Sequence, residues 1–337
     1  MQQHSSGGRI AYLDILRVVA TFAVIMVHVY AEGFYKSFNT YDWYVNAIGN
    51  SLFRWPVPIF VMISGVLFLN PQKHISNKTL YKKYVLRMGI VYLFWGLFYS
   101  LFSAILHAQY CLPFAFKWRP AVHLWFLPMI MSLYALLPIL RKVAHDDKLL
   151  KYAIVLWGAY IIGNFIIFKN VPQIKPLFVL NTIIAHSGFF LMGYYLSKTS
   201  FSKKQQGWIY SLGILCYMAG AAIVVGVSLW KGKPVAEPLN RFRPYVIMSA
   251  VALFVCMKEK VTTLNPKANW LIEHVRKDLF GVYLIHFFWL YAINWSRIEN
   301  FCDPAISLLV IGILVFIISL LSIKLIRLVP ILRKVVE

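Results

Sequence analysis

Ten long apolar runs follow one another along the chain. Each approaches the roughly 20 residues that an α-helix needs to cross the hydrocarbon core of a bilayer. They lie at residues 10–31, 47–69, 88–107, 121–140, 152–168, 177–197, 208–229, 239–257, 279–296 and 304–326. The run at 239–257 is the weakest, because its clean apolar part is too short to cross unless it extends into the Arg241 and Arg243 region. The pattern predicts about ten transmembrane helices and leaves a count of nine open.

The composition agrees with a chain that lies in the membrane over its whole length. Of the 337 residues, 60% are hydrophobic and only 14% are charged, and no polar block is long enough to fold as a separate soluble domain. A water-soluble globule and a single-pass anchor are both excluded. The connecting segments are short and no internal repeat is visible, so we expect one all-α polytopic membrane bundle over residues 1–337.

A net charge of +22 would suggest a nucleic-acid partner in a soluble protein. In a membrane protein, lysine and arginine accumulate in the cytoplasmic loops. With the amino terminus placed inside, 22 of the 34 lysine and arginine residues fall in inner segments and 10 in outer segments. This asymmetry predicts that both termini are cytoplasmic, that the protein is a multi-pass protein of the cell membrane, and that it has no nucleic-acid partner. The inner charges could meet anionic lipid headgroups or a phosphorylated ligand, and the sequence does not separate these two.

Three polar side chains of the first run lie where the bilayer penalises them. Asp14 and Arg17 are three residues apart, so they share a helix face and can pair. His28 follows eleven residues after Arg17, which returns it to within about 20° of the same face, about 16 Å further along the axis. Ionisable residues inside a bilayer usually face the bundle interior or a wet cavity. The alternative is that Arg17 extends to the inner interface and His28 is a satisfied interfacial histidine.

The second run carries Arg54 beside two prolines, Pro56 and Pro58, at the end that we expect to be outer. Proline removes backbone donors and bends or breaks a helix, and such irregular backbone is tolerated in a membrane where it lines a cavity or is buried in protein. Ser64 and Gly65 follow near the inner end. Small residues there also fit close helix packing.

Four segments of the chain together resemble the membrane acyltransferase 3 family. They are Leu13-Asp14-Ile15-Leu16-Arg17 with His28, Val57-Pro58-Ile59-Phe60-Val61-Met62-Ile63-Ser64-Gly65, His123-Leu124-Trp125-Phe126-Leu127 and Tyr283-Leu284-Ile285-His286. They occur in the family's order and at its usual spacing. The resemblance implies about ten membrane helices and transfer of an acyl group, usually acetyl from acetyl-CoA, to hydroxyls of cell-envelope glycans. It also implies essential roles for Arg17 and His28.

The chain departs from the family pattern before the third run. Relatives often carry an Arg-x-x-Arg pair there, whereas this chain has Arg87 with Tyr84 three residues earlier and Lys83 alongside. A lysine supplies the charge without the bidentate geometry of arginine. Because the chain ends soon after its last apolar run, it resembles the family's stand-alone form, without a soluble carboxy-terminal domain.

We expect the donor and the acceptor to meet inside the membrane. Acyl-CoA, the co-substrate, is cytoplasmic, so inner residues would bind it: Ser64, Arg87 and Lys83, with arginine or lysine on its phosphates. Outer residues would bind the envelope glycan or a lipid-linked saccharide: Arg54, His123 and Trp125, whose indole can stack on a sugar.

His28 is the expected general base, because a neutral imidazole can take the proton of an attacking sugar hydroxyl and return it to the leaving thiolate. Arg17, oriented by Asp14, would support the oxyanion or a donor phosphate. Ser64 has no base nearby in sequence, so direct transfer is preferred over an acyl-enzyme. His286 and His186 lie in mid-span; a lone histidine there is more often a hydrogen-bonding residue of the bundle, and a direct role of His286 gains some support from the resemblance.

No bound cofactor is expected, and nothing in the histidine or cysteine spacing proposes a metal site. The alternative functions are a secondary transporter, since broken helices and buried charges also describe carriers, and an exporter of polysaccharide or lipid-linked sugar. The sequence does not identify the glycan, separate acetyl from other acyl groups, or set the oligomeric state.

Overall fold

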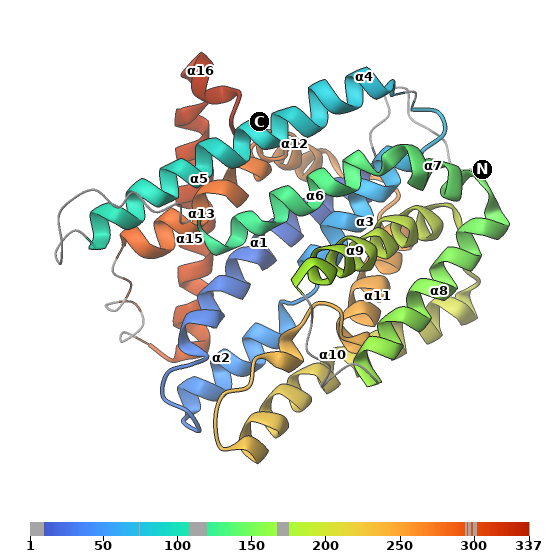
Figure 1. Cartoon of the computed structure of the whole chain (residues 1–337). Coiled ribbons are helices and arrows are strands. Elements are labelled where there is room, and N and C mark those ends of the chain that lie inside the picture. The colour runs from blue at the N-terminus through green and yellow to red at the C-terminus, as the bar shows by residue number, and fades with distance from the viewer. Residues whose placement is uncertain are drawn as a thin grey trace.

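The computed structural model of the chain is a bundle of helices, with no strand among the residues that it describes (Figure 1). The described residues are 10–73, 75–107, 120–166, 175–293, 295, 298 and 302–336. The elements, in chain order, are α1 (Ala11–Gly33), α2 (Tyr41–Leu52), α3 (Pro56–Leu69), α4 (Asn77–Thr79), the π-helix η1 (Leu80–Val85), α5 (Leu86–His107), the 3-10 helix η2 (Val122–Trp125), α6 (Phe126–Ala135), α7 (Leu137–His145), α8 (Asp147–Ile166), α9 (Lys175–Lys198), α10 (Lys203–Lys231), the 3-10 helix η4 (Glu237–Leu239), α11 (Pro244–Lys260), α12 (Pro266–Val275), α13 (Leu279–Ala292), α15 (Pro304–Ile326) and α16 (Pro330–Arg333).

The helices support an all-α polytopic membrane protein. Within the described residues, seven helical stretches are long and apolar enough to cross a bilayer, or eight if the bent stretch from Val122 to His145 counts as one. The weakest predicted run belongs to one of these, Glu237–Lys260. Helix α9 covers the sixth predicted run, and α13 covers the ninth with only 14 residues. Helices therefore occupy all ten predicted positions, while the number that cross and the side of the termini stay predictions.

The second span begins earlier than its hydropathy predicts and breaks in the middle. It runs from Tyr41 to Leu69, with α2 and α3 separated at residues 53–55, where Pro56 starts α3. Arg54 therefore lies near the middle of this helical stretch rather than at one end of it, and its side of the membrane stays a prediction. The polar residues of α2 lowered its hydropathy, but Asn46 is buried and its amide donates to the carbonyl of Asp42 at 2.8 Å.

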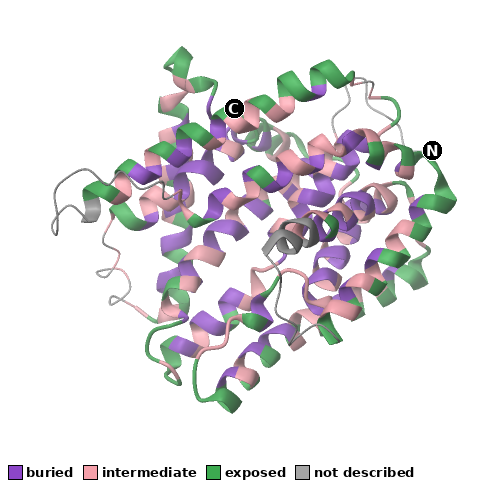
Figure 2. Cartoon of the chain, viewed as in Figure 1, coloured by how far each residue is buried: buried purple, intermediate pink, exposed green. Residues whose placement is uncertain are grey.

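Helix α1 is central to the bundle and other helices are peripheral. Of the most apolar window of α1, 61% is buried, against 17% of the corresponding window of α8. Figure 2 shows the same contrast, with buried positions along α1 and exposed positions along α8 and α10. The exposed positions of α10 include Trp208, Leu215 and Met218, apolar side chains suited to contact lipid.

Helices α3 and α9 approach each other closely because each carries a glycine at the contact. A side chain on Gly65 would overlap the backbone of Phe190, and one on Gly193 would overlap the backbone of Met62. Close packing, one of the two interpretations of the Ser64-Gly65 pair, is confirmed for Gly65. The neighbouring Ser64 is thereby held on α3 with its hydroxyl donating to the carbonyl of Phe60 at 3.0 Å.

Candidate active site

One cavity of about 410 Å³ runs between α1, α3, η2, α6 and α13. Arg17 and His28 both line it, which confirms that they share one face of the first helix. Three other predicted residues also line it, namely Ser64, His123 and Trp125. The volume lies within the range of small-molecule binding sites.

Positive charges gather at one end of this cavity, which we call the basic end and define by Arg17, Arg276 and Lys277. Arg17 pairs with the buried Asp14 at 3.1 Å, so Asp14 orients the guanidinium from behind. Arg276 lies close enough to Arg17 for their charges to interact, and both Arg276 and Lys277 are exposed. The basic end is therefore accessible from outside the bundle.

The positive electrostatic potential of the basic end also affects Lys73, in the segment between α3 and α4. Burial lowers the pKa of Lys73 in that segment, and the neighbouring charge of Arg141 lowers it further. The charges of Arg17 and Lys83 act in the same direction. Such a concentration of positive charge attracts phosphate groups.

Two of the predicted donor-binding residues stand outside the cavity. Lys83 is exposed on η1 and Arg87 is half-buried at the start of α5, and neither lines the cavity, although Met88 does. The departure from the Arg-x-x-Arg pattern coincides with the π-helix, which is a rare conformation often found at functional positions.

Three histidines from three elements meet beyond the basic end; we call them the histidine cluster. The ring centroids of His28 and His286 lie 5.4 Å apart, those of His123 and His286 4.9 Å, and those of His28 and His123 6.3 Å. His28 and His123 line the cavity, and His286 lies behind them with 0% of its surface exposed. The sequence placed these residues on separate spans, and the fold brings them together.

Backbone carbonyls fix the protonation of two of these rings. His123 Nε2 lies 3.2 Å from the carbonyl of Leu284, and His286 Nδ1 lies 2.7 Å from the carbonyl of Tyr283. A carbonyl only accepts, so each of these nitrogens carries a hydrogen in the neutral ring. The opposite nitrogens, His123 Nδ1 and His286 Nε2, are buried without a partner in the described part of the chain. Each ring therefore keeps one free lone pair at the cluster.

Tyrosines hold the backbone around the cluster. The Tyr283 hydroxyl donates to the carbonyl of His123, and the Tyr99 hydroxyl donates to the carbonyl of Leu284 at 2.7 Å. Phe287 packs on His28 and His123, with ring centroids at 5.2 and 4.9 Å. The cluster is thus a rigid and largely apolar environment.

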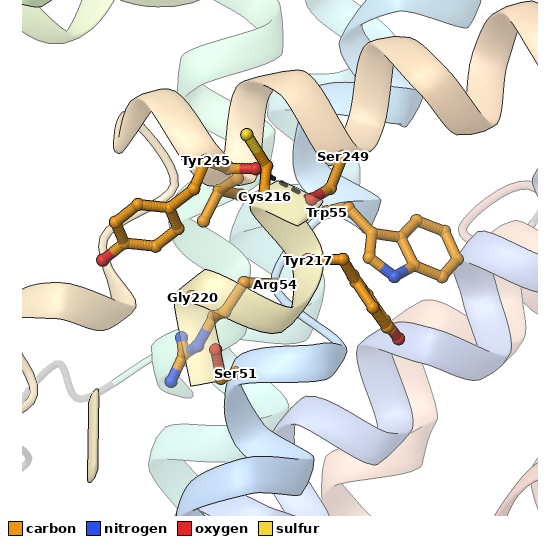
Figure 3. Close-up of a pocket in the computed structure, with 9 residues that line it drawn as sticks. Ser51, Arg54, Trp55, Cys216, Tyr217, Gly220, Tyr245 and Ser249 are labelled. Atoms are coloured by element: carbon orange, nitrogen blue, oxygen red, sulfur yellow. Dashed lines mark hydrogen bonds between the residues drawn. The ribbon is translucent and has the colours of Figure 1, made fainter. Parts of the chain in front are cut away.

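Of the three residues predicted to bind the acceptor, His123 and Trp125 line the cavity and Arg54 does not. Trp125 lines the cavity, but the guanidinium of Arg241 stacks on its ring at 3.7 Å from the centroid, so one ring face is already covered. Arg54 lines a separate small pocket with Ser51, Tyr217 and Tyr245 (Figure 3). His186 lies behind Trp125, with ring centroids 5.8 Å apart, and does not line the cavity.

Comparison with protein-family models identifies the family of the chain. The family model of the acyltransferase 3 domain matches residues 10–324. The chain belongs to the acyltransferase 3 family. No curated protein and no solved structure shows significant similarity to this family member. The matched range contains Arg17, the histidine cluster and Arg276, so the cavity lies within the acyltransferase domain, and the protein is a membrane acyltransferase.

Some lining residues of this acyltransferase were absent from the sequence prediction. Arg276 and Lys277 were counted only as inner-loop charges, Tyr134 only as a residue of an apolar run, and Tyr283 only as part of the motif that ends at His286. The sequence offered one signal for Arg276 and Lys277, namely that they form a basic pair directly before the segment that carries His286. In the described part of the chain, no group of three or more His, Cys, Asp or Glu side chains is arranged to hold a metal ion.

Proposed function

We propose that this acyltransferase moves an acetyl group from cytoplasmic acetyl-CoA to a hydroxyl of a cell-envelope glycan, and that the transfer takes place in the cavity. The proposal rests on the observation that the basic end and His28 line the same cavity. Along α1 the two ends are separated by eleven residues, or about 16 Å. An extended donor with phosphates at one end and a thioester at the other fits that arrangement.

At the basic end, Arg276, Lys277 and Arg17 bind the phosphates of the donor. Arginine and lysine make charge-assisted hydrogen bonds to phosphate oxygens, which are about twice as strong as neutral ones. The exposure of Arg276 and Lys277 lets a water-soluble donor reach them. The pantetheine arm then extends along the apolar wall that includes Phe60 and Ile63.

At the histidine cluster, His28 removes the proton of the acceptor hydroxyl as its oxygen attacks the thioester carbonyl. The new C–O bond forms, the C–S bond breaks, and His28 returns the proton to the leaving thiolate of CoA. His286 Nε2 has no partner in the described part of the chain, so its lone pair is available to accept the N–H of His28 when substrate binds, which would leave the other His28 nitrogen as the base. Direct transfer is favoured over an acyl-enzyme, because Ser64 gives its hydroxyl hydrogen to a backbone carbonyl.

The test is a transfer assay with the full chain in native membranes. Membranes that contain the protein receive acetyl-CoA labelled in the acetyl group, and the glycan fraction is examined for an alkali-labile ester. We expect the label in the glycan only when the protein is present. A correctly inserted protein that never yields a labelled ester would exclude acetyl transfer and favour an exporter or a transporter instead.

A further inference from the structure

The segment that joins α12 to α13 forms one wall of the basic end. Arg276, Lys277, Leu279 and Phe280 all line the cavity, whereas Asp278, in the middle of this run, does not. Only 1% of Asp278 is exposed, so its carboxylate is buried in the bundle outside the cavity lining. A negative charge therefore lies directly beside the two cations that we assign to the donor phosphates.

A cation from a distant part of the chain neutralises this carboxylate. The guanidinium of Arg327, just after the end of α15, donates through Nη1 to Oδ1 of Asp278. Helices α13 and α15 lie side by side there (Figure 1). A side chain on Gly281 of α13 would approach the buried side chain of Ile323 to 2.8 Å, so the last turn of α15 packs directly on the first turn of α13. The ion pair is therefore held in place by the packing of two helices.

The two carboxylates behind the basic end differ in their partners. Asp14 pairs with Arg17, which itself lines the cavity, so this carboxylate uses a cation of the basic end. Asp278 pairs with Arg327, which does not line the cavity. The two exposed cations of the basic end form no ion pair with a carboxylate of the described residues.

The balance of charges shows what Arg327 contributes. The three cations of the basic end, together with Asp14 and Asp278, would carry a net charge of +1, which Arg327 raises to +2. Without Arg327, the buried carboxylate of Asp278 would be left unpaired, which is costly. It would attract the neighbouring side chains of Arg276 and Lys277 and repel phosphate groups. Arg327 therefore affects the basic end without lining the cavity.

We propose that Arg327 is a positioning residue of the donor site: it holds the Asp278 carboxylate away from the cavity and leaves the two exposed cations of the basic end free to bind the donor phosphates. This inference rests on the proposed function for the identity of the donor. Arg327 follows the range matched by the family model, which ends at residue 324, so the family match does not include it. The alternative is that Arg327 only stabilises the carboxy-terminal end of α15, where a cation is favourable.

The experiment measures the binding of coenzyme A, without the acetyl group, to the full chain in nanodiscs by isothermal titration calorimetry. Arg327→Gln leaves the carboxylate of Asp278 unpaired, so we expect the Kd for coenzyme A to rise about fivefold to tenfold. Asp278→Asn removes the negative charge and should bind coenzyme A at least as tightly as the unchanged protein. The double variant, Asp278→Asn with Arg327→Gln, keeps the net charge of the basic end and should return the Kd to within about twofold.

Further variants separate this effect from folding and from general surface charge. Arg327→Lys keeps the charge without the planar guanidinium and should retain part of the affinity. Lys324→Gln, the matched control, removes an exposed cation from the last turn of α15, and its Kd should stay within about twofold. If Arg327→Gln does not fold because its carboxylate partner is unpaired, Asp278→Asn and the double variant still test the direction of the effect.

A purely structural role predicts a different pattern, because both single variants would then break the same contact and weaken binding alike. Weaker binding in Asp278→Asn, an unchanged Kd in a folded Arg327→Gln, or an equal rise in Lys324→Gln would each overturn the inference. A double variant that does not recover the affinity, or an unchanged protein that does not bind coenzyme A, would overturn it as well. Ester formation together with equal Kd values in all variants would sink this inference alone. Binding in the expected order without any ester formation would sink only the proposed function.

Discussion

The basic end and the histidine cluster border the same cavity but differ in exposure and charge. Arg276 and Lys277 are exposed, so their charges cost little. His123 and His286 are buried among aromatic side chains, and their hydrogen bonds to carbonyls suit neutral rings. Exposed charges can attract a charged donor from solution, so this task suits the accessible end of the cavity. Proton transfer is favoured where water is excluded, which suits the buried histidines.

Removal of the base should produce the largest effect. We expect His28→Ala to lower kcat for acetyl transfer by about 10²- to 10⁴-fold, because the cavity would lose the group proposed to accept the hydroxyl proton. The KM for acetyl-CoA should change little, since the phosphates bind at the other end. His274→Ala, which removes an exposed histidine that does not line the cavity, is the control. Comparable loss in both variants would show that the effect is not specific to the cluster.

Replacement of the second histidine should give a smaller loss that depends on the hydrogen-bond acceptor. His286→Phe keeps an aromatic ring but removes the lone pair that we assign to His28, so we expect kcat to fall by about tenfold or more. His286→Gln restores an acceptor oxygen and should recover part of the rate. Thermal unfolding of both variants measures packing separately. Equal rates in His286→Phe and His286→Gln would contradict a positioning role.

The same contrast explains what the sequence could predict. His28 and Arg17 were predicted to share a face because helical periodicity is a local property, and both line the cavity. Arg276 was missed because the asymmetry of loop charges identifies a side of the membrane without indicating which charges face a cavity. The early start of the second span at Tyr41 was also missed, because a hydropathy average counts Asn46 as polar even though it is buried and hydrogen-bonded in the fold.

At the basic end, charge removal should act on donor binding. We expect Arg276→Ala and Lys277→Ala each to raise the KM for acetyl-CoA by about threefold to tenfold with kcat nearly unchanged. The effect should shrink at high salt, because exposed charges are screened over about 8 Å at physiological ionic strength. Lys267→Ala, an exposed lysine of α12 outside the cavity lining, is the control. A KM that responds equally to all three changes would point to general surface charge.

Not every cation near the basic end is free to bind a ligand, and Arg141 tests that distinction. Its guanidinium donates to the carbonyls of Phe68 at 2.9 Å and Lys73 at 2.8 Å, so it satisfies backbone groups at the carboxy-terminal end of α3. We expect Arg141→Ala to destabilise the fold by about 2 kcal/mol, seen as a lower Tm in detergent, because charged donors to carbonyls contribute about that much. The exposed neighbour Lys142→Ala should leave the Tm unchanged. If Arg141→Ala instead kept the Tm and raised the KM for acetyl-CoA as Arg276→Ala does, Arg141 would belong to the donor site, and the basic end would extend beyond the cavity lining.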